Sequence, residues 1–226
     1  MKVVLRIGGS VVATPTNPKL MVEYVEVLEE IRKQKHEIVV VVGGGKLARE
    51  MISVAKEMGL AEPAQDEIAI SASRIFAQLF LKKLGKNGCD EIPLTLQDIV
   101  KCLRKGRVVV MGGLKPGMTT DTVAALVAKE TGADVLVKAT NQDGIYNKDP
   151  AKHSDAVKID CLKIGDLIKV LSETKHKAGI HQIIDPEAVK ILNRYHVKVV
   201  VVNGFNPKNV LSAVEGKRVG TIIETA

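Results

Sequence analysis

The sequence predicts an α/β protein in which helices cover both faces of a largely parallel sheet. Several runs of Val and Ile, such as residues 38–42 and 197–202, are continuous and do not alternate with polar residues. Such runs are typical of strands that are buried on both faces. Helical patterns separate the runs, which favours parallel pairing. Three of the runs end in glycine turns and a fourth in a polar turn, and ligands of such sheets bind beyond the carboxyl ends of the strands.

In the first part of the chain, helix-start signals separate the predicted strands. Asn17 before Pro18 is a typical start, with Asn as the N-cap. We expect Asp66 to cap a long helix, and Thr95 with Asp98 resembles a capping box. The predicted strands cover residues 3–7, 38–42 and 108–111, and the predicted helices cover about 18–34, 47–58, 66–80, 95–105 and 119–130.

The second part continues the alternation. Gly132 ends the preceding helix, and Asp185 before Pro186 starts a later one. Strands are expected over residues 135–139, 157–159, 197–202 and 221–224, and helices over 164–171, 186–195 and 207–214. Repeats, low-complexity tracts and Pro- or Ser-rich linkers are lacking, so we predict one unit over residues 1–226 with two lobes. Residues 1–132 and 133–226 form these lobes.

The composition narrows the classes of partner. Hydrophobic residues make up 46% of the 226 residues and charged residues 26%, which is ordinary for a soluble globular protein. The formal charge of +7 suits a polyanionic ligand, but Lys and Arg are mixed with Glu and not clustered. Only 3% of residues are aromatic and Trp is absent, so few side chains are available to stack on nucleic-acid bases. Small phosphorylated substrates are therefore favoured over nucleic acid.

The cysteines and the apolar runs indicate the compartment. Cys89, Cys102 and Cys161 are odd in number, far apart and without a CxxC pair, so we predict neither a disulfide framework nor a zinc site. A reducing cytosol is the expected environment. No apolar run approaches the ~20 residues of a membrane span, and Met1 leads directly into a strand. We expect a cytoplasmic protein that does not bind membranes.

Residues 108–130 are the stretch around which the chain is organised. A buried strand ends at Gly112 and Gly113, a loop follows, and Thr119, Thr120 and Asp121 begin an Ala- and Val-rich helix. This order directs free backbone N–H groups and the positive end of a helix dipole at an anion. A carboxylate does not bind phosphate directly, so Asp121 would steer a cation or orient basic side chains. The stretch predicts a site where phosphate is handled.

Two further glycine turns follow strands. Gly8 and Gly9 suit either a tight turn or a ligand, whereas the three consecutive glycines 43–45 cost conformational entropy and favour a closely approaching ligand. Arg49 either faces solvent or reaches a phosphate. The chain has no GxxxxGK[ST] motif and no GxGxxG after its first strand, which disfavours P-loop kinases and dinucleotide-binding folds. Phosphate would instead be bound by several glycine turns that face one another.

Four motifs occur in series: R-I-G-G-S, V-V-G-G-G-K-L-A-R, M-G-G-x-x-P-G-x-T-T-D-T-x-A-A and T-N-x-D-G-x-Y-x-x-D-P. Together with a late D-P-E-A-V-K-I-L helix, they resemble the amino acid kinase superfamily and, within it, the uridylate kinases of archaeal type. The resemblance covers essentially the whole chain. It implies a three-layer αβα sandwich, a homohexamer, and phosphoryl transfer from Mg-ATP to UMP.

The resemblance also implies roles for individual residues. The residues expected at ATP are Gly9, Ser10, Gly45, Arg49, Thr140, Asn141, Tyr146 and Asp149. Those expected at UMP are Gly44, Asp66, Leu114, Lys115, Pro116, Gly117, Met118, Thr119 and Thr120. Asp66 would bind the ribose hydroxyls. From the residues alone, Tyr146 is also compatible with a place in the core and Asp149 with a simple turn.

One position departs from the family pattern. Many members carry Lys where this chain has Arg6, and a planar, always charged guanidinium is not equivalent to an ammonium. We hypothesise that Arg6 is the catalytic charge stabiliser and that Asp121 orients the cationic group or a metal-bound water. In the alternative, Arg6 is structural and Lys46, Lys138 or Lys177 takes its place.

Other readings stay open at this point. The nearest is another kinase of this fold that acts on acetylglutamate, aspartate, carbamate or isopentenyl phosphate. A non-catalytic nucleotide-binding or storage protein is a second alternative, and a nucleic-acid-binding protein a third. Phe76 stands where relatives often carry a small or polar residue, which leaves uracil contacts from its helix open. His176 and His181 are assigned to a surface loop and not to a metal site.

Overall fold

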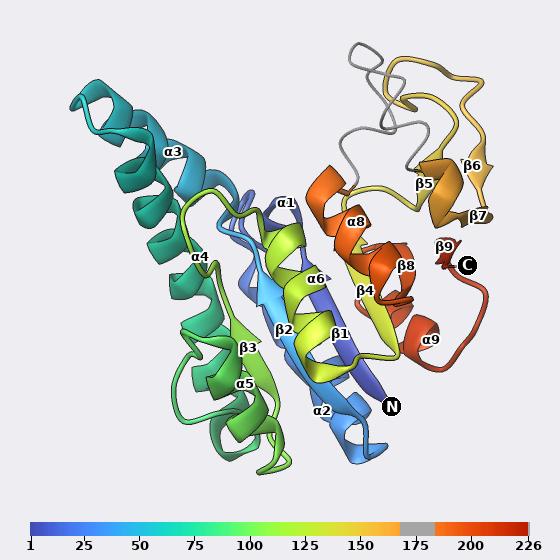
Figure 1. Ribbon diagram of the computed structural model, residues 1–226, viewed down its shortest axis with the longest axis horizontal. Coiled ribbons are helices and arrows are strands. Elements are labelled where there is room, and N and C mark those ends of the chain that lie inside the picture. Colours follow the sequence, from blue (N-terminus) through green and yellow to red (C-terminus); the bar gives the residue numbers. More distant parts are fainter. Residues whose placement is uncertain (168–183, 226) are drawn as a thin grey trace.

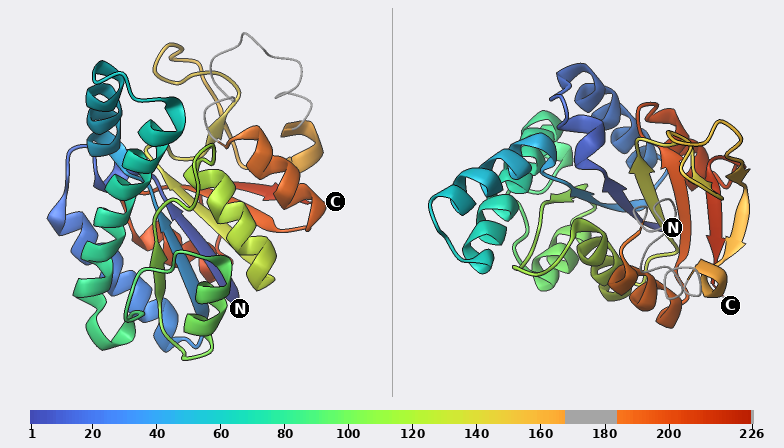
Figure 2. Two further views of the ribbon diagram at one scale, coloured as in Figure 1. Left: turned by 60° about the vertical axis from the view of Figure 1, so that its left-hand side comes forward. Right: turned by 90° about the horizontal axis from the view of Figure 1, so that it is seen from above.

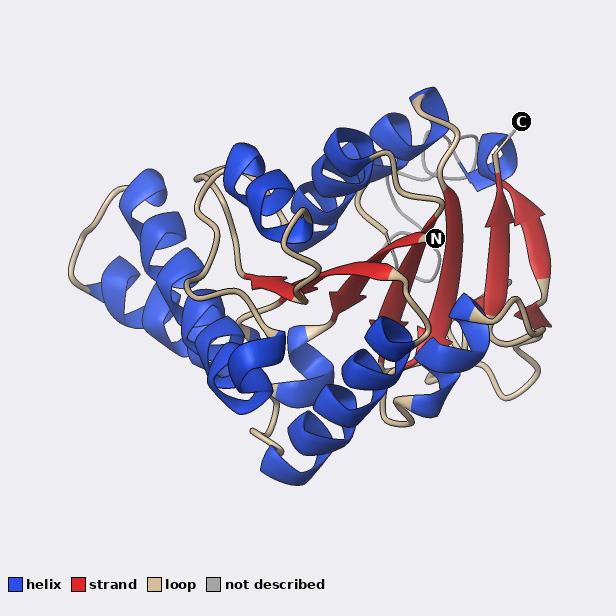
Figure 3. Ribbon diagram, turned by 90° about the horizontal axis from the view of Figure 1, so that it is seen from below, coloured by secondary structure: helices blue, strands red, loops and turns tan. Residues whose placement is uncertain are grey.

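The computed structural model describes residues 1–167 and 184–225 and centres on a seven-stranded sheet with the order β3-β2-β1-β4-β8-β9-β7. Helices lie above and below this sheet (Figure 3). Its strands are β1 (Lys2–Ile7), β2 (Glu37–Val42), β3 (Val109–Met111), β4 (Val135–Thr140), β7 (Cys161–Lys163), β8 (Lys198–Asn203) and β9 (Thr221–Glu224). All neighbouring pairs are parallel except β8 with β9. The predicted αβα class with a mainly parallel sheet is therefore confirmed.

The helices connect the strands and cover the two faces of the sheet (Figure 3). They are α1 (Gly9–Val12), α2 (Pro18–Lys33), α3 (Gly45–Glu57), α4 (Glu62–Leu84), α5 (Leu96–Leu103), α6 (Thr120–Thr131), α8 (Pro186–Arg194) and α9 (Lys208–Val214). Helices α3 and α4 lie at the β3 end of the sheet, and a small sheet of β5 (Ile145–Tyr146) and β6 (Lys158–Ile159) lies at the opposite end (Figures 1 and 2). Of the helix predicted over 164–171, residues 164–167 are described and helical. None of the described helices is both long enough and apolar enough to span a membrane.

Most of the predicted helix starts are confirmed. The side chain of Asn17 accepts from the N–H of Leu20 at 3.1 Å, and Thr95 accepts from the N–H of Asp98 at 3.2 Å. Asp185 caps α8 in the same way. These polar side chains satisfy N–H groups that have no partner inside the helix.

The prediction that Asp66 caps α4 is wrong. Helix α4 begins at Glu62, with Ala61 as the N-cap and Pro63 in the first turn, where a missing N–H costs nothing. Asp66 therefore lies inside the helix. Its carboxylate is free to accept a hydrogen bond from the N–H of Gly117, 2.6 Å away.

The prediction that the cysteines form no disulfide is also wrong. Cys89 and Cys102 are paired, with their Cα atoms 6.0 Å apart, inside the usual range for disulfides. The chain turns back between them, so α5 places Cys102 beside Cys89, and distance along the sequence does not exclude the pair. Cys161 is free and exposed.

The parallel strands bring their carboxyl ends to one edge of the sheet. Gly8 follows β1, Gly43 follows β2, Gly112 follows β3, and Thr140 ends β4. The ladder continues into the turns, because the N–H of Gly8 donates to Ala139 at 2.9 Å and that of Gly43 donates to Ile7 at 3.0 Å. The predicted convergence of these turns at one edge is confirmed. The strands of residues 1–132 and those of residues 133–226 meet where β1 pairs with β4.

Candidate active site

The glycine turn after β1 (Gly8 and Gly9) and the glycine turn after β2 (residues 43–45) touch each other through their backbones. A Cβ atom on Gly9 would clash with the backbone of Gly45, and one on Gly43 would lie 2.8 Å from the nitrogen of Gly9. A Cβ on Gly44 would lie 2.6 Å from the Cβ of Ala48. Close packing within the protein is thus a sufficient reason for the three consecutive glycines, which the sequence alone had assigned to a closely approaching ligand. Gly45 also has a φ of +56°, a value that glycine adopts without strain.

Thr14 links these two turns and was not singled out from the sequence. Its hydroxyl donates to the carbonyl of Gly9 at 3.1 Å and accepts from the N–H of Lys46 at 2.8 Å. Arg49 donates to the same hydroxyl at 3.3 Å. Arg49 is exposed and lies beside the glycine turns, a position from which it can reach a bound phosphate.

The loop of residues 112–119, here called the acceptor loop, is held by α4. Asp66 accepts from Gly117, and the hydroxyl of Ser73 accepts from the N–H of Gly113 at 2.8 Å. Arg74 donates to the carbonyls of Gly113 and Leu114 at 3.2 and 3.3 Å. Neither Ser73 nor Arg74 was identified from the sequence, because only the folded chain shows which face of α4 meets the loop.

A hollow of about 130 Å³ lies between α4, the second glycine turn and the acceptor loop. Five of the residues predicted to bind UMP line this hollow: Gly44, Asp66, Lys115, Met118 and Thr120. They come from three separate stretches of the chain. The structure therefore brings together a large part of the predicted acceptor site.

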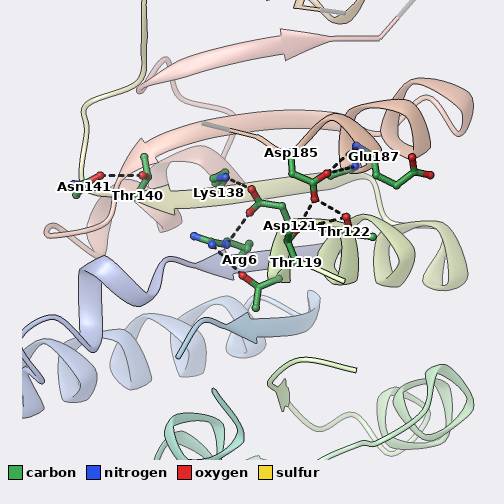
Figure 4. A network of polar contacts seen from close by, with 11 residues as sticks. Arg6, Thr119, Asp121, Thr122, Lys138, Thr140, Asn141, Asp185 and Glu187 are labelled. Atoms are coloured by element: carbon green, nitrogen blue, oxygen red, sulfur yellow. Dashed lines mark hydrogen bonds and ion pairs between the residues drawn. The ribbon is translucent and has the colours of Figure 1, made fainter. Parts of the chain in front are cut away.

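Arg6, Asp121 and Lys138 form an ion-paired cluster at the same edge (Figure 4). Arg6 and Lys138 are register neighbours on β1 and β4, so their side chains lie side by side. Nε of Arg6 lies 2.8 Å from one carboxylate oxygen of Asp121, and Nζ of Lys138 contacts the other. The side chains of Asp121 and Lys138 are only 12% and 5% exposed. Asp121 thus holds two cations together at the start of α6.

The guanidinium of Arg6 lies between two of the turns. Its Nη2 atom donates to the hydroxyl of Thr120 at 3.0 Å. Its Nη1 atom is close to the first turn, since a Cβ on Gly8 would lie 2.9 Å from it. Arg6 is therefore next to both the predicted ATP side and the predicted UMP side, as its hypothesised role requires.

Lys138 carries the clearest electrostatic perturbation of the site. Burial lowers its pKa to about 8, and the nearby charge of Arg6 lowers it as well, whereas Asp121 and Asp185 oppose the shift. The sequence offered Lys138 only as a substitute for Arg6. The register of β1 and β4 places it beside Arg6.

Because of this lowered pKa, we expect the free energy of unfolding to increase as the pH rises from about 8 to 10.5. Lys138 has a pKa of about 8 in the folded protein against 10.5 as its ordinary value, so between these values the unfolded chain holds more protons and the free energy of unfolding rises with pH. Below about pH 8 the full cost of burying the ammonium is present. Urea denaturation of wild type at pH 7.5 and pH 10 should show a gain on the order of 2 kcal/mol that Lys138→Met lacks. The same pH dependence in both proteins would contradict this assignment.

Asp185 connects the starts of two helices and was recognised from the sequence only as a cap. Its carboxylate contacts the hydroxyls of Thr119 and Thr122 (Figure 4) and accepts from the N–H of Glu187 at 2.8 Å. Burial opposes its ionisation, but these hydrogen bonds together hold its pKa below the ordinary value. The hydroxyl of Thr119 also caps α6 at Thr122, 3.1 Å away. Thr119 therefore has protein partners where a contact to UMP was predicted.

The remaining four residues expected at ATP, from Thr140 to Asp149, lie toward the β5–β6 end of the molecule (Figure 1). Thr140 donates to the side chain of Asn141 at 3.3 Å at the end of β4. Tyr146 lies in β5 and is partly buried. Asp149 accepts from the N–H of Ala151 at 3.0 Å, so it makes the turn that was its alternative interpretation. Lys177, His176 and His181 lie outside the described residues.

The comparisons place the chain in a known class of phosphotransferases. The model of the amino acid kinase family matches residues 1–203, and the chain belongs to this family. The resemblance to its archaeal-type uridylate kinases is confirmed by two relatives named uridylate kinase. One, from Archaeoglobus fulgidus, is 41% identical over 223 residues, which cover 99% of this chain and 100% of the relative. The other, from Methanobrevibacter smithii, is 38% identical over 98% of each chain.

Solved structures show the same relationship. The crystal structure of uridylate kinase from Archaeoglobus fulgidus matches with a TM-score of 0.88 and 39% identity, over 99% of this chain and 100% of that one. A UMP kinase from Bacillus anthracis matches with a TM-score of 0.83 at 22% identity, over 99% of this chain and 95% of that one. The second match shows that the fold is shared.

Proposed function

We propose that the protein is a UMP kinase that transfers the γ-phosphoryl group of Mg-ATP to UMP and releases UDP and ADP. The hollow between Gly44, Asp66 and the acceptor loop is the observation that carries this proposal. It unites residues predicted for UMP and lies beside the glycine turns predicted for the ATP phosphates. The similarity to uridylate kinases over nearly the whole chain supports the same substrate pair.

The reaction requires positioning and charge stabilisation more than covalent chemistry. In the proposed arrangement, the backbone of Gly9 and Gly45 with Ser10 and Arg49 binds the ATP phosphates. The acceptor loop and the start of α6 bind the UMP phosphate. Arg6 lies between the two sides and donates from its Nη atoms to the oxygens of the transferred group, where developing charge is greatest.

Asp121 acts on the cations and not on the phosphates. Its two carboxylate oxygens contact Arg6 and Lys138, which fixes the position of both positive groups before substrate binds. Lys138 adds a second positive charge beneath the phosphates. With ATP bound, the added negative charge favours the protonated form of Lys138.

Magnesium is proposed to enter as part of the substrate Mg-ATP. No group of three or more His, Cys, Asp or Glu side chains lies together in residues 1–167 and 184–225, and both oxygens of Asp121 already face cations. Mg²⁺ is commonly held by substrate phosphates, waters and only one or two carboxylates. The described residues fit this manner of binding better than a cage built by the protein.

Assembly, location and lobe roles are further parts of the proposal. We propose a homohexamer in the cytoplasm, active in pyrimidine nucleotide synthesis, with UMP on the side of residues 1–132 and ATP on the side of 133–226. Exposed apolar side chains on α3, at its C-cap and on α4 support self-association: Met51, Val54, Met58, Ile75 and Leu79. Neither nucleic acid nor a membrane is a proposed partner.

Initial rates with Mg-ATP test the activity directly. We expect UMP to be phosphorylated faster than CMP and dUMP, and acetylglutamate, aspartate, carbamate and isopentenyl phosphate to be inactive as acceptors. A faster rate with one of the last four would show another kinase of this fold. Binding of ATP without turnover of any acceptor would show a nucleotide-binding protein.

A further inference from the structure

Arg74 contacts the acceptor loop from the side that faces α4. Its Nε and Nη2 atoms donate to the carbonyls of two successive residues, Gly113 and Leu114, at 3.2 and 3.3 Å. A planar guanidinium presents two donors in a fixed fork, which suits two neighbouring carbonyls. We infer that Arg74 is a positioning residue for UMP, an inference that rests on the proposed function of the acceptor loop.

The loop is packed against the helix with little room for adjustment. A Cβ on Gly112 would lie 2.8 Å from the backbone nitrogen of Arg74, and one on Gly113 would lie 2.9 Å from the side chain of Ile70. Ser73 is 3% exposed. Its hydroxyl accepts from Gly113 and donates to the carbonyl of Ile70 at 2.7 Å. The hydrogen bonds of Arg74 therefore hold a stretch of backbone that is already packed tightly against α4.

The two carbonyls fix the direction of the next two N–H groups. In a trans peptide the C=O and the N–H of one plane point in opposite directions. Since the carbonyls of Gly113 and Leu114 point toward Arg74, the N–H groups of Leu114 and Lys115 point away from it. Neither N–H has a hydrogen-bond acceptor among residues 1–167 and 184–225. The hydrogen bonds of Arg74 thus direct the N–H groups of Leu114 and Lys115, which have no acceptor in the described part of the chain, away from α4. These two successive donors suit the phosphate or the uracil carbonyls of UMP.

Lys82 offers a matched control on the same helix. Lys82 and Arg74 line one groove beside α4. Lys82 is exposed and makes no hydrogen bond or ion pair with the described residues. Lys82→Met removes a positive charge from the same helix and the same groove and leaves the acceptor loop unaltered.

Steady-state kinetics separate a positioning role from a structural one. We expect Arg74→Met to raise KM for UMP about tenfold, with KM for ATP within twofold of wild type. Arg74→Lys should remain impaired for UMP, because an ammonium does not reproduce the fork, and Lys82→Met should match wild type. An unchanged KM for UMP in Arg74→Met, or an equal rise in KM for ATP, would overturn the inference. Full recovery in Arg74→Lys would overturn the two-carbonyl arrangement.

Hydrogen–deuterium exchange of the ligand-free protein gives a readout independent of activity. Within the peptide covering residues 112–119, we expect the amides of Gly113 and Gly117, which donate to Ser73 and Asp66, to exchange about tenfold faster in Arg74→Met than in wild type or Lys82→Met. Unchanged exchange would overturn the inference even if activity fell. Faster exchange with no UMP phosphorylation by wild type would instead show that the positioning role stands and that the proposed acceptor is wrong.

Discussion

Replacing Arg6 with Met is expected to lower kcat by about 10²- to 10³-fold, with smaller changes in KM for ATP and UMP. The guanidinium lies between Gly8 and Thr120, where the transferred group would pass from one nucleotide to the other. Its charge is most useful when the two phosphates share the transferred group, so its removal acts mainly on the transition state. Initial rates at saturating Mg-ATP and UMP measure the effect.

Two further variants make this result specific. Arg6→Lys keeps the charge without the fork and should recover part of the lost rate. Arg107→Met removes a guanidinium that contacts Asp90 on the surface, and we expect wild-type turnover from it. Near-normal turnover in Arg6→Met would show that Arg6 is structural and would transfer the role to another cation, with Lys138 as its buried neighbour.

Replacing Asp121 with Asn is expected to lower the free energy of unfolding by about 3–5 kcal/mol. The carboxylate is the shared partner of Arg6 and Lys138, and both sit in surroundings that exclude most water. Without it, two like charges face each other with only the more distant charge of Asp185 to offset them, and α6 loses an acidic residue from its first turn. Urea denaturation at pH 7 measures the loss, and kcat should fall in parallel because Arg6 is no longer held.

A double variant distinguishes an unpaired buried charge from a general packing defect. Asp121→Asn with Lys138→Met removes the buried ammonium as well as its partner, so it should recover a substantial part of the lost stability. Stability of Asp121→Asn within 1 kcal/mol of wild type would contradict the shared-partner role. A double variant less stable than Asp121→Asn alone would contradict it too.

Local chemistry explains why much of the fold was predictable. The continuous Val runs of β2 and β8 and the caps at Asn17, Thr95 and Asp185 depend on neighbouring residues, which a sequence shows directly. The prediction that Asp66 caps α4 failed because the helix begins earlier, at Glu62, with Pro63 in its first turn. The prediction that the cysteines form no disulfide failed because the pairing of Cys89 with Cys102 depends on how the chain folds back between them.

The location of the candidate site could be predicted from the sequence, but many of the contacts within it could not. The glycine turns identify the sheet edge because each directly follows a strand in sequence. The neighbours of these groups come from register and from distant segments. Arg6 beside Lys138 depends on the pairing of β1 with β4, and Asp185 beside Thr119 joins residues 66 positions apart.

A crystal structure with UMP and a non-hydrolysable ATP analogue tests the central claim most directly. We predict the UMP phosphate against the acceptor loop and the start of α6, the γ-phosphate at the turns of Gly9 and Gly45, and the guanidinium of Arg6 between them. Nucleotides bound on opposite faces of the sheet, or with Arg6 out of reach of both phosphates, would contradict the account.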